Sequence, residues 1–552
     1  MLKIAVIGNY ATQFLLKPLK KQFHSIDVEF YQSEFNSIDM EFIDRNSNLY
    51  SFDPDFIIWH ESTLGLRDVF YQSQITDRPE FATKYITRIN SYLSTVSALL
   101  PKCKVLFPNH SLRFLDNIFG NFSSKVTISW DFQIQKINQL LNEASIDAQN
   151  LYLLETTPAT RENFITDYSM VVNAELHFTP QYLDWISGKI KQTINAFHGS
   201  FKKCVILDLD NTLWGGIIGD DGLENIHIGS LGIGKAFTRF QKWLKELKQR
   251  GIILAVCSKN EDSIAKSPFL EHPEMILKLD DIAIFTANWN SKADNINNIQ
   301  KVLNIGFDSM VFIDDNPAER EIVRNHLPKV TVPELPVDPA NYLPYLISLN
   351  LFETISHSAN DAERTKQYQQ EAKRAELSAT ITNMDDYLKS LDMKARITEL
   401  SEVNIERVAQ LTQRSNQFNL RTKRYTAADV ANICKNPNYL TATVEIEDKF
   451  GNYGLISVVI IEIKDNQAMI DNWIMSCRVL KRNVEHALMN YLVEKLTTTN
   501  IHQMTGEYIP TEKNALVANL LSDLGMKTTD TNQYSLILSE YNFNQHFIRI
   551  NP

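Results

Sequence analysis

The residues with the clearest chemical potential are two acidic side chains at the end of an apolar run. In VILDLDNTLWGG, Asp208 and Asp210 come directly after the apolar residues 205–207. Residues two apart on a strand face the same side, so both carboxylates lie together where the strand ends. Two neighbouring anions repel each other unless a cation lies between them, and Mg²⁺ prefers such oxygen ligands. The pair therefore predicts a magnesium site that also receives a phosphoryl group.

The same arrangement recurs further along the chain. Asp314 and Asp315 end a second apolar run in VFIDDNPAE, Ser258 ends a third in AVCSKNED, and Lys292 opens a helical segment. Because the carboxyl ends of parallel strands meet at one edge of a sheet, we expect these groups to face the first pair. Lys292 then supplies a positive charge for phosphate.

The pattern around these residues predicts strands that alternate with helices. We expect three strands and two helices, at 204–209, 252–257, 309–314, 235–250 and 293–304. The stretches between the motifs are short, from residue 208 to 258 and from 258 to 292, so a large cap over the site is not expected. An open site favours a bulky substrate, or one presented by another protein or domain.

The full length of 552 residues, with 44% apolar residues, predicts several domains. Short apolar runs alternate with helical segments near the start, which predicts an α/β domain with a mainly parallel sheet. Consecutive strands without intervening helices after about residue 380 predict an α+β domain. The expected domains are 1–195, 200–340 and 381–552, with a linker and charged helix at 341–380.

Two segments suggest how the last two domains are joined. PKVTVPELPVDP contains four prolines and marks the exit from the second domain: Pro328, Pro333, Pro336 and Pro339. The segment NDAERTKQYQQEAKRAEL, 360–377, is heavily charged, which is typical of a solvated helix between domains.

Bulk properties exclude several classes of partner. The formal charge of −11 argues against nucleic-acid or anionic-membrane binding, and no apolar run approaches the length of a membrane span. The start, MLKIAVIG, is typical of a buried strand and lacks the features of a signal peptide. The five cysteines lie far apart without a C-x-x-C pair, so we expect neither disulfides nor a zinc ribbon, and a cytoplasmic location.

One cysteine lies in a basic segment. In MSCRVLKRN we expect the chain to pass from a strand into a helix, whose free N–H groups and dipole attract anions. Arg478, Lys481 and Arg482 add positive charge there. Cys477 is then either an activated nucleophile or a small buried apolar side chain, and the local residues leave both interpretations open.

The order of DLDNT, Ser258, Lys292 and IDDNP resembles the haloacid dehalogenase superfamily of aspartyl-phosphate phosphohydrolases. The resemblance implies that Asp208 attacks phosphorus and that Asp210 protonates the leaving oxygen. It implies that Mg²⁺ is bound by Asp208, Asp314 and the main-chain carbonyl of Asp210, with Asp315 as a ligand or just outside the ligands. The implied phosphate-binding residues are Asn211, Ser258, Lys259 and Lys292.

The whole chain resembles the FkbH-like family, subfamily IIIC of the same superfamily. The matching segments are DLDNTLWGGIIGDDG, SKN, IDDNP, NQFNLRTKRY, KFGNYGLISVV, MSCRVLKRNVE and GEYIPTEKN. The resemblance implies an α/β fold class: a Rossmann-like haloacid dehalogenase core without a large cap. An SGNH-like α/β domain precedes this core and a GNAT-like α+β acyltransferase domain follows it.

The resemblance also implies a function, that of a bifunctional glyceryl transferase/phosphatase in polyketide extender unit biosynthesis. Cys477 attacks the acyl-phosphate carbon of 1,3-bisphosphoglycerate, a small phosphorylated acyl donor. The remaining phosphate is removed with Mg²⁺, and the glyceryl group passes to the phosphopantetheine arm of an acyl carrier protein. The implied acyl- and pantetheine-binding residues are Asn416, Asn419, Arg478, Lys481 and Arg482. His486 and His502 are both candidates for the general base.

The chain departs from the family patterns at two places. Family members tend to read CRVLGRG at the cysteine, whereas this chain has Lys481 and Asn483 at the glycine positions. The block that carries an SGNH nucleophile reads Gly8-Asn9-Tyr10, without a serine, so the first domain is expected to be non-hydrolytic. The polar residues near its strand ends are then expected to be structural: His60, Asn109 and His177.

Two other functions compete with the bifunctional enzyme. One is an Mg²⁺-dependent phosphatase of another phosphorylated metabolite or protein, with the outer domains as binding modules. The other is a non-enzymatic scaffold, which the complete acidic motif disfavours.

Overall fold

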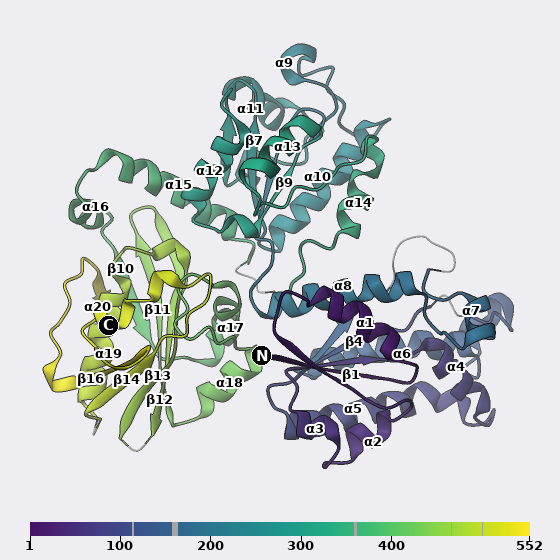
Figure 1. The fold of residues 1–552 in the computed structure, drawn as a ribbon. Coiled ribbons are helices and arrows are strands. Elements are labelled where there is room, and N and C mark those ends of the chain that lie inside the picture. The colour runs from purple at the N-terminus through teal and green to yellow at the C-terminus, as the bar shows by residue number, and fades with distance from the viewer. Residues whose placement is uncertain (113–114, 157–163, 358–360, 465, 500, 552) are drawn as a thin grey trace. The chain divides into compact units, whose positions relative to one another are not determined.

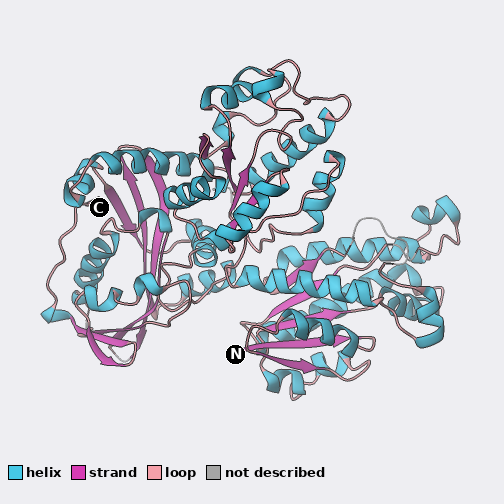
Figure 2. Ribbon diagram, turned by 45° about the horizontal axis from the view of Figure 1, so that its top comes forward, coloured by secondary structure: helices cyan, strands magenta, loops and turns pink. Residues whose placement is uncertain are grey.

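The computed structural model describes residues 1–552 except 113–114, 157–163, 358–360, 465, 500 and 552. The chain forms two compact units, Met1–Ile194 and Asn195–Pro552. Their strands belong to three sheets, drawn in magenta in Figure 2. Within the described part of the chain, no helix combines the length and apolar character needed to span a membrane.

The first unit is built on a five-stranded parallel sheet. Its strands are β1 (Leu2–Gly8), β2 (Val28–Gln32), β3 (Phe56–His60), β4 (Lys104–Pro108) and β5 (Leu151–Leu154). Their order is β2-β1-β3-β4-β5, which is a common order of doubly wound α/β sheets. The finer assignment to an SGNH-like fold stays a prediction.

Helices cover both faces of this sheet (Figure 1). They are α1 (Gln13–Gln22), α2 (Ile38–Ile43), α3 (Asn48–Phe52), α4 (Thr63–Gln72), α5 (Phe81–Leu99), α6 (Trp130–Asp147), α7 (Tyr168–Ala174) and α8 (Pro180–Phe197). Alternate strand residues such as Ala5, Ile7, Ile57 and Trp59 pack in one core with apolar residues of α5 and α6. Burial on both faces explains why these strands are nearly continuous apolar runs.

The second unit begins with a four-stranded parallel sheet. Its strands are β6 (Cys204–Leu207), β7 (Ile253–Ser258), β8 (Ile284–Ala287) and β9 (Met310–Ile313), in the order β8-β7-β6-β9. The helices of this region are α9 (Ile218–Asp221), α10 (Gly234–Gln249), α11 (Asp262–Glu271), α12 (Lys292–Leu303), α13 (Pro317–His326) and α14 (Tyr342–Ser348).

The central strand β6 is buried on both faces. Val205 and Leu207 pack in one core with α10, whereas Cys204 and Ile206 pack in another with α12. Because the strands are parallel, the residues that follow them gather at one edge. From residue 208 to 292, a stretch described throughout, the chain forms α9, α10, β7, α11 and β8, so no separate cap domain is inserted.

The rest of the second unit contains a mixed sheet of eight strands. They are β10 (Lys394–Thr398), β11 (Tyr439–Asp448), β12 (Gly451–Lys464), β13 (Gln467–Met475), β14 (Gln503–Glu507), β15 (Lys527–Asp530), β16 (Gln533–Ile537) and β17 (Arg549–Asn551). The order is β15-β16-β14-β13-β12-β11-β10-β17. The accompanying helices are α16 (Met384–Ser390), α17 (Ile405–Arg414), α18 (Ala427–Lys435), α19 (Val484–Thr497) and α20 (Leu520–Asp523).

The segment predicted as a linker and solvated helix packs instead against its neighbours. Tyr342 and Leu346 of α14 are buried in the core beside β6. The charged segment forms α15 (Arg364–Thr380), in which Tyr368 packs in the core with α12 and Arg374 is 1% exposed. Residue 360, the predicted helix start, lies outside the described residues. The prediction of solvation was wrong for this face of α15, because Arg364, Glu371 and Arg374 are paired within the protein.

Arg374 makes the most enclosed of these pairs. Its Nε and Nη2 donate to the two carboxylate oxygens of Asp448 at 2.8 and 2.7 Å, and Nη1 contacts Glu371 at 2.9 Å. Asp448 has no exposed side-chain surface. The pair ties α15 to the end of β11.

Replacing Arg374 by methionine is expected to lower the free energy of unfolding by about 3–5 kcal/mol, because the buried Asp448 then loses its bidentate partner and keeps Arg482, at 3.8 Å, as its nearest cation. Urea unfolding of the parent and variant measures this change. The matched control is Arg396→Met, which breaks an exposed pair with Glu445 and should leave stability almost unchanged. Equal stability of both variants would contradict this assignment.

Candidate active sites

The acidic and basic residues of the sequence motifs meet at the carboxyl edge of the β6–β9 sheet. Asp208 directly follows β6, Asp314 directly follows β9, Ser258 ends β7 and Lys292 begins α12. Three of these residues lie where a buried strand ends, and Lys292 lies where the chain enters a helix after a strand. The parallel topology therefore places side chains from four distant segments at one edge.

Three carboxylates form a compact cluster at this edge. Oxygens of Asp208, Asp314 and Asp315 lie within 4.8 Å of one another. Lys292 Nζ lies 2.9 Å from Asp208 Oδ2 and 2.5 Å from Asp314 Oδ2. A set of carboxylate oxygens with an adjacent ammonium fits Mg²⁺ together with a phosphate, because each group balances a charge of the other.

Burial changes the pKa values of the groups in this cluster. It raises the pKa of Asp314 to about 7, assisted by the charge of Asp208 and opposed by Lys292. Burial followed by the same Asp208 charge raises the pKa of Asp315. Burial by itself lowers the pKa of Lys292, but Asp208 and Asp314 raise it well above its usual value. A divalent cation relieves the repulsion among these carboxylates.

Asp210 lies beside the cluster but its carboxylate is held by other groups. Oδ1 accepts hydrogen bonds from Trp214 Nε1 and the Ile218 backbone N–H, both at 3.0 Å, and Oδ2 accepts one from Asn260 Nδ2 at 2.7 Å. Burial raises the pKa of Asp210, which favours the protonated form that a general acid requires. Metal ligation through its main-chain carbonyl stays a prediction.

The predicted phosphate-binding residues have different surroundings. Ser258 is buried at the strand end. The Asn211 side chain accepts a hydrogen bond from the Gly216 backbone N–H at 2.9 Å, and thus closes the loop after β6. Lys259 pairs with Glu319 at 2.6 Å. Of the predicted cations, Lys292 is therefore the one that contacts the acidic cluster.

Two residues that support the site were missed by the sequence analysis. Asn260 holds Asp210, and the signal for it was its position two residues after Ser258, in the same loop. Arg320 of α13 donates through Nη1 to the backbone carbonyls of Asp314 and Asp315, at 2.8 and 2.7 Å. An arginine inside a charged helix gives no sign of this contact, since it depends on how α13 folds back on the loop.

The acidic cluster predicts stabilisation by magnesium. Mg²⁺ at about 100 times its Kd should raise the free energy of unfolding by about 2.7 kcal/mol, because it binds the folded state alone. Asp314→Asn should remove most of this gain, which thermal unfolding with Mg²⁺ or with EDTA measures. Asp262→Asn, at an exposed carboxylate of α11, should keep it. An unchanged magnesium effect in Asp314→Asn would exclude the cluster as the metal site.

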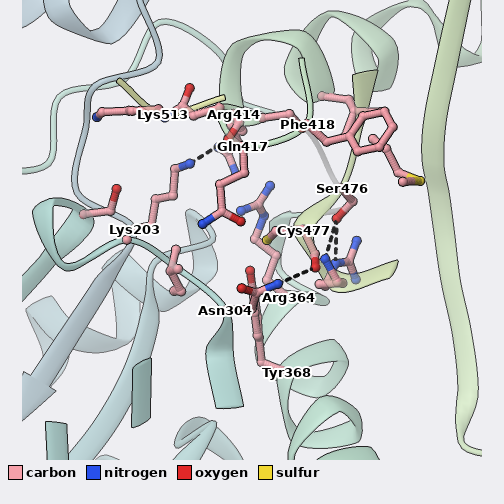
Figure 3. A pocket seen from close by; sticks show the side chains of 18 of the residues that line it. Lys203, Asn304, Arg364, Tyr368, Arg414, Gln417, Phe418, Ser476, Cys477 and Lys513 are labelled. Atoms are coloured by element: carbon pink, nitrogen blue, oxygen red, sulfur yellow. Dashed lines mark hydrogen bonds between the residues drawn. The ribbon is translucent and has the colours of Figure 1, made fainter. Parts of the chain in front are cut away.

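A second candidate site surrounds Cys477, in a cavity of about 250 Å³ (Figure 3). Cys477 begins the short 3₁₀ turn Cys477–Val479 after β13. Its backbone carbonyl accepts from Asn304 Nδ2 at 2.8 Å, and its side chain hydrogen-bonds with Tyr368. The lining also includes Lys203, Arg364, Arg407, Arg414, Gln417, Arg478 and Lys513. The thiol therefore lies in a strongly basic cavity.

The prediction that a helix begins at Cys477 was wrong. Helix α19 begins at Val484, several residues later, so its dipole does not act directly on the thiol. The positive field at Cys477 comes instead from side chains of other segments. Lys481 and Asn483 have φ values of +62° and +61°. These are the positions at which the family pattern has glycine, which adopts this backbone conformation without strain.

The residues predicted to bind an acyl group or pantetheine differ in their position and in their partners. Arg478 lines the Cys477 cavity. Lys481 and Arg482 line a neighbouring cavity, which Cys477 and Arg478 also line. Arg482 pairs with Glu371 at 2.9 Å. Its guanidinium is thus already engaged by a carboxylate.

Asn416 and Asn419 also differ. Asn416 lines the cavity, donates to the Gly199 carbonyl at 2.9 Å and accepts from Arg424. Asn419 is fully buried and forms a backbone bridge with Ile474 of β13. The side chain of Asn419 is thus enclosed by the chain beside β13, and its role in ligand binding stays a prediction.

Neither histidine candidate for the general base reaches the cavity. His486 Nδ1 contacts the Gln545 carbonyl at 3.1 Å, His502 is exposed, and neither lines the cavity. Lys203 does line it, and Figure 3 shows Lys203 and Cys477 on walls of the same pocket. Burial lowers the pKa of Lys203 to about 7, although the charge of Cys477 opposes this effect.

The two sites lie at opposite edges of one sheet. Lys203 directly precedes β6 and Asp208 directly follows it, so the four residues of β6, or five steps along the chain, separate them. At about 3.3 Å a residue this is about 16 Å. We therefore expect that a small group bound to Cys477 does not reach the acidic cluster.

In the first unit, the polar residues near the strand ends are largely paired. His60 contacts the Tyr10 hydroxyl at 2.6 Å, and burial followed by the charge of His110 lowers its pKa to about 3. His177 Nδ1 lies 2.8 Å from Ser62 Oγ. This serine lies outside the block Gly8-Asn9-Tyr10, is 1% exposed and caps α4.

The remaining polar residue of that set, Asn109, directly follows β4. Its backbone N–H donates to the Leu154 carbonyl at 2.9 Å, and its backbone carbonyl accepts from the Thr156 hydroxyl at 2.8 Å. These contacts fix the loop after the strand.

Comparisons with known proteins relate both units to one family. Residues 3–195 match the family described as FkbH, N-terminal domain. A crystal structure of the N-terminal part of the protein BF1531 from Bacteroides fragilis, containing a phosphatase domain complexed with Mg, is 45% identical. The match covers 64% of this chain and 94% of that one, with a TM-score of 0.61. None of the curated proteins compared with the chain matches it.

Acetyltransferase structures match the carboxyl-terminal part far more weakly. The ribosomal-protein-S18-alanine N-acetyltransferase from Escherichia coli is 15% identical, with 28% of this chain and 99% of that one covered and a TM-score of 0.21. We draw no conclusion from a TM-score this low. The Bacteroides fragilis relative, by contrast, is 45% identical over 94% of its own length. The chain therefore belongs to the FkbH-like family and contains a phosphatase domain of the haloacid dehalogenase type.

Proposed function

We propose that the chain is a bifunctional enzyme that removes phosphate with Mg²⁺ and transfers an acyl group through Cys477. The observation that carries the phosphatase half is the cluster of Asp208, Asp314 and Asp315 with Lys292 against two of its members. The magnesium of the Bacteroides fragilis relative supports the choice of metal. When bound, Mg²⁺ balances the charge of the phosphoryl group during its transfer.

The proposed roles in phosphate removal are those that the family resemblance implies, and the geometry supports them. Asp208 is the nucleophile that takes the phosphoryl group from the leaving oxygen, and Lys292 neutralises the charge beside it. Asp210, held by Asn260 and Trp214, donates the proton to the leaving oxygen. An activated water then releases inorganic phosphate from Asp208.

The proposed acyl transfer takes place at Cys477. The donor is an acyl phosphate, and the family resemblance makes the glyceryl donor 1,3-bisphosphoglycerate the leading candidate. A bond forms between Sγ and the carbonyl carbon while the bond from that carbon to the phosphate oxygen breaks. The phosphate leaves with the bonding electrons and receives the thiol proton. The resulting thioester passes to the phosphopantetheine thiol of an acyl carrier protein.

The distance between the sites bears on the order of these steps. Since about 16 Å of extended strand separates Lys203 from Asp208, a phosphate on the acyl group is removed while that group is away from Cys477. The mobile arm of a carrier protein spans such a distance. We therefore propose that the phosphate is removed while the acyl group is bound to the carrier protein, and not while it is bound to Cys477.

We also place the protein in the cytoplasm, because all five cysteines are free thiols.

The deciding experiment is incubation with an acyl phosphate donor and candidate carrier proteins, followed by intact-mass measurement of both proteins. The proposal expects a carrier that gains the acyl mass only when Cys477 is present. Turnover of free phosphoesters without any carrier acylation would support instead a phosphatase with accessory binding domains.

A further inference from the structure

The cavity beside Cys477 contains more positive than negative charge. Five cations in its lining are buried or half-buried: Lys203, Arg364, Arg407, Arg414 and Arg478. Behind them, the fully buried Asp361 contacts Arg364 Nε at 3.0 Å and Arg414 Nη1 at 2.5 Å. One carboxylate thus forms ion pairs with two of the five cations.

The other three cations contact neutral groups among the described residues. Arg407 donates to the Gln410 side chain and to the Leu455 carbonyl, the latter at 3.4 Å. Arg478 donates to the Gln367 side chain and to the Tyr453 carbonyl.

Lys203 Nζ donates to the Arg414 carbonyl at 2.6 Å. The acidic residues of the lining itself are Asp308 and Glu512, and Asp308 pairs with Lys513. The charge of the deeper cations is therefore not balanced by the carboxylates described around the cavity.

Cations withdrawn from water without a counter-ion are unfavourable, and the pKa values reflect this. Burial lowers the pKa of Lys203 to about 7 and that of Arg414 to about 9. Burial and the charges of Arg364, Arg478 and Arg414 also lower the pKa of Arg407. A bound anion would supply the missing charge, and guanidinium groups match the oxygens of phosphate in pairs.

We propose that this cavity is a phosphate-binding site, in which Lys203, Arg364, Arg407 and Arg414 hold the phosphate group of a ligand next to the Cys477 thiol. The ligand class is a small phosphate ester or acyl phosphate. Phosphate binding stands on the charge balance of the cavity, whereas its use in acyl transfer rests on the proposed function. In that reaction the same cations stabilise the phosphate that leaves when the thioester forms.

Protection of Cys477 against alkylation tests this site directly. The protein is treated with iodoacetamide, which is uncharged, in EDTA and at constant ionic strength, with inorganic phosphate replacing chloride. At ten times its Kd, phosphate should slow alkylation of Cys477 about tenfold, because only about one site in eleven is then free. Peptide mass spectrometry follows each cysteine separately.

The chain provides an internal control and a matched variant. Cys434 is the other cysteine that is not fully buried, and its alkylation should not respond to phosphate. Lys203→Met and Arg407→Gln should each weaken protection of Cys477. Lys202→Met should not, because Lys202 donates to the Asp308 carbonyl at 2.6 Å and does not line the cavity.

The outcomes separate this site from the proposed function. Absence of protection in the parent protein would overturn the site, whatever the variants do. Protection as strong in Lys203→Met and Arg407→Gln as in the parent would also overturn it. Since no turnover is needed, protection with a protein that never acylates a carrier would keep the phosphate site while the transferase proposal fails.

Discussion

Asp208→Asn is expected to lower Mg²⁺-dependent phosphate release by on the order of a thousandfold or more, because an amide cannot accept the phosphoryl group. The carboxylate at this position lies against Lys292 at 2.9 Å and within the cluster that includes Asp314. Phosphate release from a small phosphoester, with Mg²⁺ and with EDTA, measures the effect. In the carrier assay, the same variant should let a phosphorylated acyl group accumulate on the carrier protein.

Asp220→Asn is the matched control for this change. Asp220 lies in the exposed turn α9, twelve residues after Asp208, and is not part of the acidic cluster. Its replacement should leave phosphate release within about twofold of the parent rate, as is usual for a surface site away from the chemistry. Asp208→Asn with parental phosphate release would exclude an aspartyl-phosphate at this position and with it the phosphatase half of the proposal.

Cys477→Ala is expected to abolish acylation of the carrier protein while leaving Mg²⁺-dependent phosphate release intact. The thiol is the nucleophile of the proposed transfer, and alanine provides no atom that forms a thioester. Because Lys203 of the Cys477 cavity precedes β6 and Asp208 follows it, the substitution should not alter the acidic cluster. Intact masses of enzyme and carrier, together with released phosphate, measure both halves on one sample.

Cys434→Ala serves as the control for thiol loss. Cys434 lies in α18, where its Sγ contacts the Leu400 carbonyl at 3.5 Å, outside the Cys477 cavity. It should acylate the carrier at the parental rate. If Cys477→Ala does so too, the thioester scheme is wrong, and the basic cavity serves binding alone.

The sequence predicted the phosphatase edge well because its information is local. An apolar run followed directly by Asp208, or by Asp314, states both that a strand is buried and where it ends. The parallel topology then follows from the alternation with helices, and it brings the strand ends together without further information. Lys292, at the start of α12, was placed by the same rule.

The Cys477 cavity required the tertiary structure. Its buried and half-buried cations come from the residue before β6, from α15 and α17, and from the turn after β13, and the most distant two are 275 residues apart (478 − 203). No periodic pattern in the sequence relates Lys203 to Arg407 or Arg414. The sequence placed the positive field in a helix amino end, whereas α19 begins later. The charged side chains of α15 were predicted to be solvated, because the sequence shows that Arg374 is charged but not how close it lies to Asp448.

The sequence by itself thus determined the parallel core and the acidic residues at its edge, since strand ends are encoded by neighbours along the chain. The tertiary structure decided which side chains surround Cys477, that Asn419 is buried, and that the two sites lie on opposite edges of one sheet. The physical reason is that buried ion pairs and cavities arise from contacts between distant segments, whose partners become defined only when the chain has packed.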